Sequence, residues 1–309
     1  MNLESVKRLA LLFPGQGSQF VGMGHALCRE SAAARAVFEE ADAALGFSLS
    51  RLCFEGPEEE LKLTVNTQPA ILTHSVAAFR DLQSRSPERL EGAVIAAGHS
   101  LGEYSAGVAS GALSFAEAVL LTRQRGRFMQ EAVPPGVGAM AAILGLAPEV
   151  VEAACREAAE DEVVAPANFN APEQTVIAGH AGAVGRACER CRAKGAKRTV
   201  PLPVSAPFHC ALMAPARERM RPLLAAAPFS NPSWPVVANF DATPHSRGAE
   251  LRDALVHQID SPVRWVESVR TLAREGVDRA LEIGPGNVLA GLVKRIEKGI
   301  AVESYGGPA

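Results

Sequence analysis

Short apolar runs alternate with longer helical patterns along the first 132 residues, and this alternation constrains the fold more than any other feature of the sequence. Residues 8–13 and 92–98 are the clearest of these runs, and each is followed by a glycine-bearing turn and a segment of helical periodicity. Strands separated by helices form parallel sheets that the helices cover. The sequence therefore predicts an α/β fold, in which the turns after the strands are the usual places for binding and chemistry.

The pattern changes after the helix-breaking sequence Pro134-Pro135-Gly136. The elements expected beyond it follow the ferredoxin-like order β-α-β-β-α-β, at residues 139–144, 148–159, 163–168, 174–178, 181–194 and 197–204. Past Pro207 the chain returns to the larger unit, with a late strand at 280–283 and a basic final helix. We therefore expect a large α/β-hydrolase-like domain formed by residues 1–134 and 206–309, with a small ferredoxin-like α+β domain inserted at 135–205.

Charge and hydropathy exclude several classes of function. The formal net charge of the 309 residues is only −3, so the chain lacks the dense positive charge that nucleic acids or acidic lipids attract. No apolar stretch is long enough to cross a bilayer, and the run at 9–13 is too short for the core of a signal peptide. We expect a cytoplasmic and monomeric protein. Its partners should be small molecules or proteins rather than nucleic acid or membrane.

The six cysteines are irregularly spaced in a large chain, which argues against a disulfide framework. Cys188 and Cys191 form a Cys-x-x-Cys pair, but they fall in a helical pattern and no second pair completes a zinc site. Free thiols are the expectation, and no metal is expected.

The sequence Gly-His-Ser-Leu-Gly at residues 98–102 fits the pattern Gly-x-Ser-x-Gly and lies between an expected strand and an expected helix. Glycines on either side of the serine permit a sharp turn that exposes the hydroxyl, and the backbone N–H after the serine can join an oxyanion hole. In this setting Ser100 is a candidate nucleophile.

A serine nucleophile needs a base, and histidine is the usual one near neutral pH. His209 leads among seven histidines because it lies where the chain re-enters the large domain and where a loop can reach the edge of the sheet. The alternatives have structural interpretations or carry no motif: His99 beside the serine, His74 and His257 in helical patterns, and His25, His180 and His245 near loops.

An orienting acid between serine and histidine, as in α/β-hydrolase esterases, is not evident. The intervening acids fall mostly within the predicted insertion or on the exposed part of the helix before it. A backbone carbonyl can orient the His209 imidazole instead.

Arg125 is out of place in its helical pattern. A capping box at Ser114 and Glu117 predicts a helix over residues 114–132, with a polar stripe that Arg125 does not join. Its helical neighbours are apolar, so its charge must reach solvent, pair with a buried acid, or await an anionic ligand. Beside an activated serine, a guanidinium would suit a substrate that carries a free carboxylate.

The glycine-rich loop at residues 14–19 follows the first expected strand. It is not a nucleotide-binding loop, because Phe20 stands where the third glycine of Gly-x-Gly-x-x-Gly is required. Its backbone N–H groups remain candidates for binding an oxyanion.

Together these segments resemble the malonyl-CoA:acyl-carrier-protein transacylases of fatty-acid synthesis and the related polyketide acyltransferases. The resemblance spans nearly the whole chain and rests on residues 13–19, 66–70, 98–104, 125–130, 168–179, 262–265 and 284–286. It implies transfer of malonyl from coenzyme A to an acyl carrier protein by a ping-pong exchange between thioesters, with no metal or redox cofactor.

The resemblance also implies a role for each site residue. Ser100 would attack the thioester, with His209 as base and later as acid and the backbone around Gln258 orienting it. The N–H groups of Gln16 and Leu101 would hold the oxyanion, and Arg125 would pair with the malonyl carboxylate. Further candidates for the pocket are Gln68, His99 and Phe208, and the bulky Phe208 ring would disfavour methylmalonyl.

Two other functions remain open. A serine esterase or thioesterase would share Ser100 and His209 but would offer Arg125 no anion. A carrier-protein docking module with an inactive site would need no catalytic residues, yet all those expected are present.

Overall fold

The computed structural model describes residues 8–204 and 206–307. Within them the larger sheet has six strands in the order β10-β9-β1-β2-β7-β8. Their bounds are β1 Leu9–Phe13, β2 Ala93–Gly98, β7 Val236–Val237, β8 Pro244–His245, β9 Arg279–Ile283 and β10 Ala301–Tyr305. The pairs from β10 to β7 are parallel, and only β7 with β8 is antiparallel. The predicted α/β class is confirmed.

Helices cover both faces of this sheet because alternate residues of its central strands are apolar on both sides. Leu9, Leu11 and Phe13 of β1 pack into the main core with the helices before β2 and the two that follow it, whereas Ala10 and Leu12 pack into a second core with α12 and α13. The helices of this part are α1 His25–Glu30, α2 Ala32–Leu45, α3 Leu49–Glu55, α4 Glu58–Lys62, α5 Thr64–Arg85, α6 Gly102–Ala109, α7 Phe115–Glu131, α10 Ala214–Ala226, α11 Gly248–Gln258, α12 Trp265–Arg274 and α13 Val288–Ile296, with short 3₁₀ turns at Pro87–Leu90 and Ala211–Met213.

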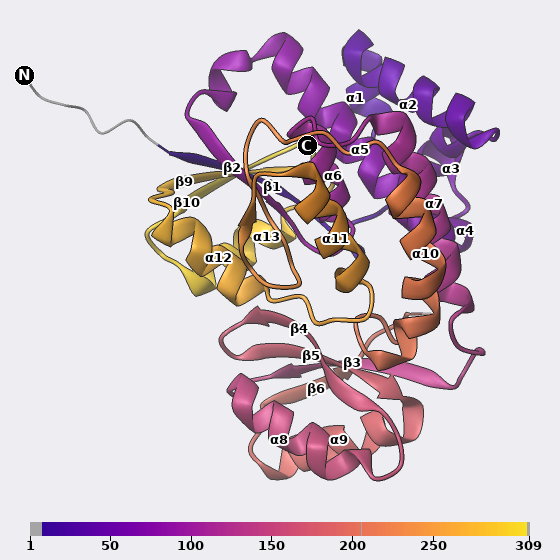
Figure 1. Ribbon diagram of the computed structural model, residues 1–309, viewed down its shortest axis with the longest axis vertical. Helices are drawn as coiled ribbons and strands as arrows, with labels where there is room; N and C mark the ends of the chain where they lie inside the picture. The colour runs from indigo at the N-terminus through magenta and orange to yellow at the C-terminus, as the bar shows by residue number, and fades with distance from the viewer. Residues whose placement is uncertain (1–7, 205, 308–309) are drawn as a thin grey trace, which may run out of the picture.

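The smaller sheet is antiparallel and lies below the larger part in Figure 1. Its order β4-β5-β3-β6 arises from the chain sequence β3 Gly138–Leu144, α8 Pro148–Ala159, β4 Val164–Ala171, β5 Gln174–His180, α9 Ala181–Ala193 and β6 Arg198–Pro201. This confirms the predicted β-α-β-β-α-β succession. The predicted end of the insertion, residue 205, lies outside the described residues.

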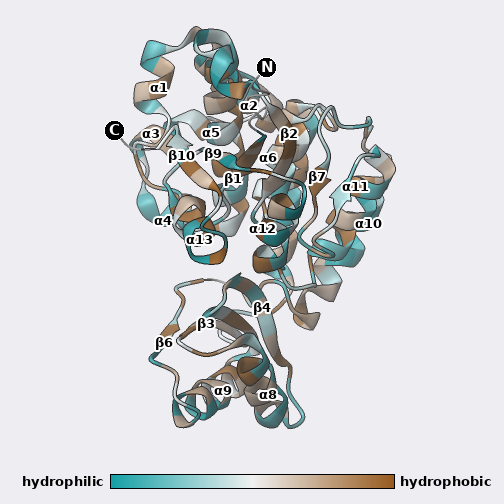
Figure 2. Cartoon of the chain, turned by 90° about the vertical axis from the view of Figure 1, so that its left-hand side faces the viewer, coloured by the Kyte–Doolittle hydropathy of each residue, from teal (hydrophilic) through white to brown (hydrophobic). Residues whose placement is uncertain are grey.

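The smaller sheet packs against its helices on one face and against the main core on the other. Ala141, Ile143 and Ile177 lie in a core with α8 and α9, whereas Met140 and Val176 join the main core. The backbone of β4 also bonds the segment before α12, through Val263 N to Ala167 O (2.8 Å) and Phe169 N to Val263 O (2.9 Å). In Figure 2, β4 is accordingly the strand of the smaller sheet that lies nearest α12.

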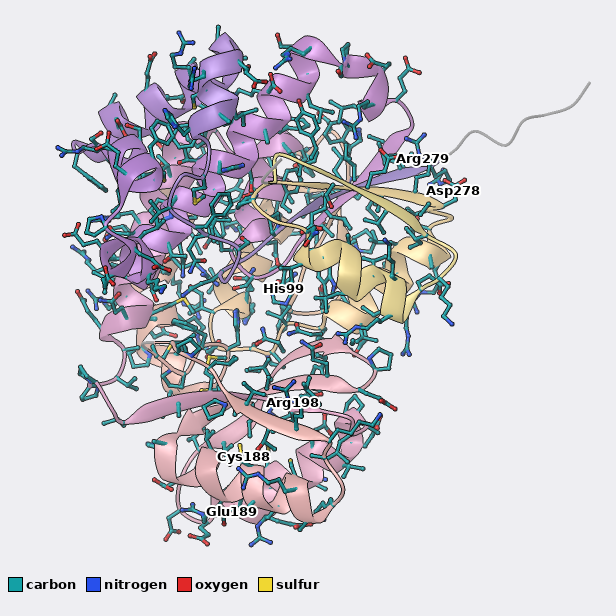
Figure 3. The ribbon with its side chains drawn as sticks, turned by 180° about the vertical axis from the view of Figure 1, so that it is seen from behind. His99, Cys188, Glu189, Arg198, Asp278 and Arg279 are labelled. Carbon is teal, nitrogen blue, oxygen red and sulfur yellow. The ribbon has the colours of Figure 1, made fainter. Side chains whose placement is uncertain are left out.

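The last helix is not the last element, because the edge strand β10 follows α13, and its half-exposed sequence Ala-Val-Glu-Ser-Tyr carries no apolar run. Cys188 and Cys191 lie in α9 as predicted, and all six cysteines are buried free thiols. Figure 3 shows Cys188 on this helix, far from His99.

Among the residues that the structure describes, no helix combines the length and the apolar character that crossing a bilayer requires. The same residues contain no group of three or more His, Cys, Asp or Glu side chains placed to hold a metal ion.

Candidate active site

Ser100 lies in the sharp turn between β2 and α6, at the carboxyl end of the central strands. Its φ of 51° is in the left-handed region, which residues other than glycine rarely adopt. The turn is tight enough that only glycine fits beside it: a Cβ on Gly98 would lie 1.9 Å from the carbonyl carbon of Gly102, and one on Gly102 would lie 2.1 Å from Phe13 O. The two glycines therefore permit a turn that presents the serine hydroxyl.

His209 lies within hydrogen-bond distance of this serine. It comes from the loop before the 3₁₀ turn at Ala211–Met213, and its Nε2 is 2.7 Å from Ser100 Oγ. Its Nδ1 is 3.0 Å from the backbone oxygen of Gln258. A carbonyl only accepts, so Nδ1 carries the proton, and Nε2 is left to accept the proton of the serine hydroxyl.

Burial, and after it the positive charge of Arg125, lower the pKa of His209 to about 3, although the bond to the Gln258 carbonyl opposes the shift. The imidazole is therefore neutral at physiological pH and ready to act as a proton acceptor.

Arg125 is on α7, whose predicted start at Ser114 is confirmed by the bond from Glu117 N to Ser114 Oγ. Only 1% of Arg125 is exposed, although it carries a charge. Its Nη1 donates to Gln68 Oε1 (2.8 Å), and its Nη2 donates to Gln258 Oε1 (2.8 Å) and to Ser100 Oγ (3.2 Å). Its Nε has no hydrogen-bond partner among the residues that the structure describes.

Every acceptor that surrounds this guanidinium is a neutral oxygen. No ion pair of Arg125 occurs in the described part of the chain, and the side chain does not reach solvent. Exposure to solvent and a direct ion pair with a buried acid, two of the three possibilities left open by the sequence, are thereby excluded. A buried cation without a direct ion pair is costly, and burial accordingly lowers the pKa of Arg125, although the nearby Tyr104 and Glu103 oppose the shift. An anion beside Ser100 would offset the cost of burying this charge.

Two backbone loops meet next to the serine. His99 N donates to Phe13 O (3.0 Å), and a Cβ on Gly15 would lie 2.4 Å from His99 O, so the loop after β1 and the loop after β2 pack backbone against backbone. Within the described ranges, the N–H groups of Gln16 and Leu101 have no protein acceptor. Leu101 also precedes the first turn of α6, where the helix dipole favours negative charge.

The remaining predicted pocket residues lie around this centre. Gln68 contacts Arg125, and Phe208 is buried next to His209. His99 bonds to the smaller sheet: its Nε2 is 2.8 Å from Asn170 Oδ1, and its ring packs on Trp265. Figure 3 shows His99 between the larger part and the smaller sheet. A hollow lined by the 14–18 loop, His99, Asn170 and α13 opens at this boundary.

Sequence reasoning missed two buried residues behind the serine. Asn239 follows β7, a two-residue strand without a recognisable pattern. Glu103 belongs to the motif around the serine, and an acid in the first turn of a helix made otherwise of small and apolar residues is the same kind of anomaly that singled out Arg125. Neither residue is accessible to solvent.

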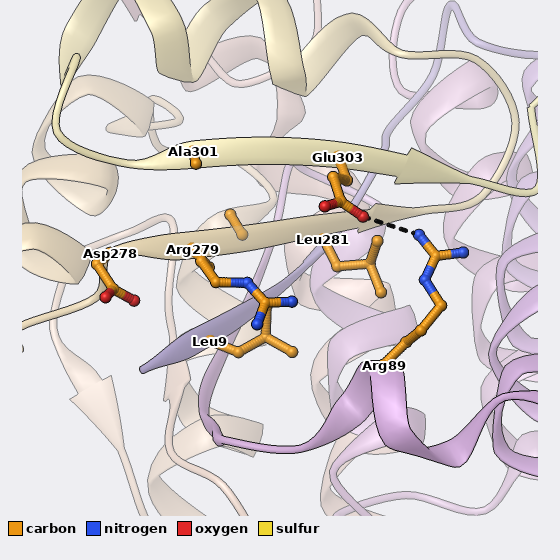
Figure 4. Close-up of a pocket in the computed structure, with 8 residues that line it drawn as sticks. Leu9, Arg89, Asp278, Arg279, Leu281, Ala301 and Glu303 are labelled. Atoms are coloured by element: carbon orange, nitrogen blue, oxygen red, sulfur yellow. Dashed lines mark hydrogen bonds and ion pairs between the residues drawn. The ribbon is translucent and has the colours of Figure 1, made fainter. Parts of the chain in front are cut away.

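A second hollow lies at the opposite, amino-terminal edge of the large sheet (Figure 4). It is lined by the first residues of three strands, Leu9, Arg279 and Ala301, with Arg89 already paired to Glu303 at 3.0 Å. Because Ser100 follows the carboxyl end of β2, this hollow does not belong to the candidate site.

Comparison with known proteins gives consistent similarities. Residues 10–304 match the model of the family described as acyl transferase domain. The malonyl CoA-acyl carrier protein transacylase of Escherichia coli (strain K12) is 50% identical over 302 residues, which cover 98% of this chain and 97% of that protein.

Solved structures agree with the sequence similarity. The acyl-carrier-protein S-malonyltransferase of Burkholderia pseudomallei 1710b superimposes with a TM-score of 0.93 at 49% identity, covering 97% of each chain. A malonyl-transacylase solved in complex with its type II PKS acyl-carrier protein gives a TM-score of 0.94 at 45% identity, covering 98% of this chain and 97% of that one. The similarity extends over nearly the entire chain.

Proposed function

This chain belongs to the acyl transferase domain family, and from that premise we propose that it moves a malonyl group from malonyl-CoA to the phosphopantetheine thiol of an acyl carrier protein through Ser100. The observation that carries the proposal is the buried guanidinium of Arg125, 3.2 Å from the serine hydroxyl and surrounded only by neutral acceptors. A free carboxylate on the acyl group supplies the direct ion pair that this cation lacks.

In the first half-reaction, neutral His209 takes the proton of the Ser100 hydroxyl, and the serine oxygen forms a bond to the thioester carbonyl carbon. The N–H groups of Gln16 and Leu101, which have no acceptor among the described residues, stabilise the resulting oxyanion. The carbon–sulfur bond then breaks, and the coenzyme A sulfur leaves with the proton from His209. The product is a malonyl ester of Ser100.

In the second half-reaction, the thiol of the carrier protein gives its proton to His209 and attacks the ester. The serine oxygen leaves and recovers that proton. Substrate and product are both thioesters, so the exchange is close to thermoneutral and follows ping-pong kinetics. The carbonyl of Gln258 keeps the imidazole in one tautomer through both steps, in place of the acid of an esterase triad.

Acyl-enzyme lifetime tests this function. After malonyl-CoA is added and excess substrate removed, the malonyl label should persist in buffer and disappear when carrier protein is added. Rapid loss to water alone would instead identify a thioesterase. Ser100→Ala should abolish covalent labelling in intact-mass spectrometry, whereas Ser105→Ala, which alters another buried serine on the adjoining helix, should label normally.

Three further expectations belong to the same proposal. Residues 135–205 act as an inserted domain, and the protein acts as a cytoplasmic monomer. Light scattering on the purified chain tests the oligomeric state. Assays with carrier proteins of fatty-acid and of polyketide synthesis identify which pathway it serves.

A further inference from the structure

Two side chains hold the peptide groups on either side of Ser100. Asn239 Oδ1 accepts from Ser100 N at 2.6 Å, and Gln258 Nε2 donates to Ser100 O at 2.8 Å. Asn239 Nδ2 also donates to Gly98 O at 2.7 Å, so the single amide of Asn239 spans the turn that holds the serine. The left-handed φ of Ser100 is thereby fixed by partners from outside its own loop.

The backbone N–H of Asn239 and the side chain of Gln258 meet at one carboxylate oxygen. Glu103 Oε2 accepts from Asn239 N at 2.8 Å and from Gln258 Nε2 at 2.9 Å. Its other oxygen, Oε1, is buried and has no hydrogen-bond partner in the described ranges. Burial raises the pKa of Glu103 to about 7, against the effect of both hydrogen bonds. A costly buried carboxyl group thus joins the loop after β7 to the end of α11.

Through Gln258 the carboxylate of Glu103 is also linked to Arg125 and His209. Gln258 Oε1 accepts from Arg125 Nη2, and its backbone oxygen accepts from His209 Nδ1. Ser100, His209 and Arg125 come from three segments that are distant in the sequence. Gln258 by itself links the carboxylate of Glu103 to each of these three residues.

We propose that Glu103 and Asn239 are positioning residues for acyl transfer: Asn239 fixes the turn that presents Ser100, and Glu103 holds Asn239 and Gln258 so that the serine and Arg125 keep their relative placement. This inference rests on the proposed function, because it assumes that Ser100 is acylated. Neither residue touches the acyl group, so both act through the residues that do.

The two residues differ in what their loss should do. Asn239→Ala releases the serine turn alone, so acylation by malonyl-CoA and by acetyl-CoA should slow by the same factor, on the order of tenfold to a hundredfold for a misplaced nucleophile. Glu103→Ala also releases Gln258 and therefore Arg125. It should slow both reactions and in addition lower the preference for malonyl over acetyl. In Glu103→Gln the amide oxygen can replace Oε2 and accept both bonds, so this variant should stay within a few-fold of the parent.

Rapid-quench measurement of acyl-enzyme formation tests the proposal. The burst amplitude gives the fraction of enzyme molecules that are competent, and the rate constant gives the speed of acylation in each competent molecule. A purely structural role would lower the amplitude. It would leave the rate per site and the malonyl-to-acetyl ratio unchanged. Ser105→Ala on α6 is the matched control, because it removes a buried hydroxyl that has no partner within 8–204 and 206–307, and it should change neither quantity.

An unchanged rate per site in Asn239→Ala would overturn the proposal, as would a Glu103→Gln enzyme as slow as Glu103→Ala. If Asn239→Ala does not fold, Asn239→Asp replaces the donor to Gly98 by a second oxygen, and its rate per site must also fall. Mass spectrometry separates this inference from the proposed function: malonyl label that survives in Ser100→Ala refutes the function itself, whereas normal labelling of Ser100 with a normal rate in Asn239→Ala refutes only the positioning role.

Discussion

Replacing Arg125 by alanine separates recognition of the malonyl carboxylate from the chemistry of acylation. The guanidinium donates to Gln68, Gln258 and Ser100, and in the substrate complex we expect a charge-assisted pair with the carboxylate. Such a bond contributes about 1.5–3 kcal/mol, and every 1.36 kcal/mol is a factor of about ten in rate. The kcat/KM for malonyl-CoA should therefore fall by roughly tenfold to two hundredfold.

Acetyl-CoA offers no carboxylate, so its transfer should hold or improve in Arg125→Ala. Loss of the positive charge removes the second largest cause of the lowered pKa of His209, which makes the imidazole a stronger base. The assay compares kcat/KM for malonyl-CoA and acetyl-CoA at fixed carrier-protein concentration. Arg127→Ala provides a matched control, because it removes an exposed arginine two residues along the same helix and should leave both values unchanged.

Equal losses with malonyl-CoA and acetyl-CoA would refute this reasoning and would mean that Arg125 only supports the fold. Arg125→Lys separates the contribution of the charge from that of the guanidinium geometry. It keeps the charge but loses the planar fork, so its malonyl activity should lie between those of the parent and Arg125→Ala.

Three further predictions follow from the geometry. A pKa of about 3 keeps His209 neutral as the pH falls through 6.5, so malonyl-enzyme formation should show no acid limb there, and a limb near 6.5 would contradict the assignment. Phe208→Ser should raise the rate with methylmalonyl-CoA relative to malonyl-CoA by at least about tenfold in a competition assay, because the ring excludes the extra methyl group; an unchanged ratio would exclude this role. Gly102→Ala places a Cβ 2.1 Å from Phe13 O and should lower the free energy of unfolding in urea by about 1–3 kcal/mol, whereas Gly185→Ala, with no atom within 4 Å, should not.

Local patterns in the sequence were sufficient for the individual elements. The apolar runs predicted β1, β2 and β9 to within a residue at each end, and the capping box at Ser114 placed the start of α7. The short strands β7 and β8 could not be predicted, since two residues show no periodicity. The half-exposed β10 has no apolar run for the same kind of analysis to detect.

The features of the candidate site likewise fall into those that the sequence shows and those that it does not. The glycines around Ser100 and the misplaced charge of Arg125 are visible in the sequence because each breaks a local rule. What Arg125 contacts is not visible, because Gln68 and Gln258 lie 57 and 133 residues away along the chain. The sequence left three possibilities open for this charge. Two of them were excluded only by its burial and by its contacts with Gln68 of α5 and Gln258 of α11.

The sequence by itself determined the α/β class, the turn that carries Ser100 and the presence of a cation on an apolar helix face. Only the tertiary structure decided that Asn239, Glu103 and Gln258 converge behind that turn. The reason is physical: turns, caps and periodic faces depend on residues within about one helical turn of each other, whereas hydrogen bonds between buried side chains depend on how distant segments pack.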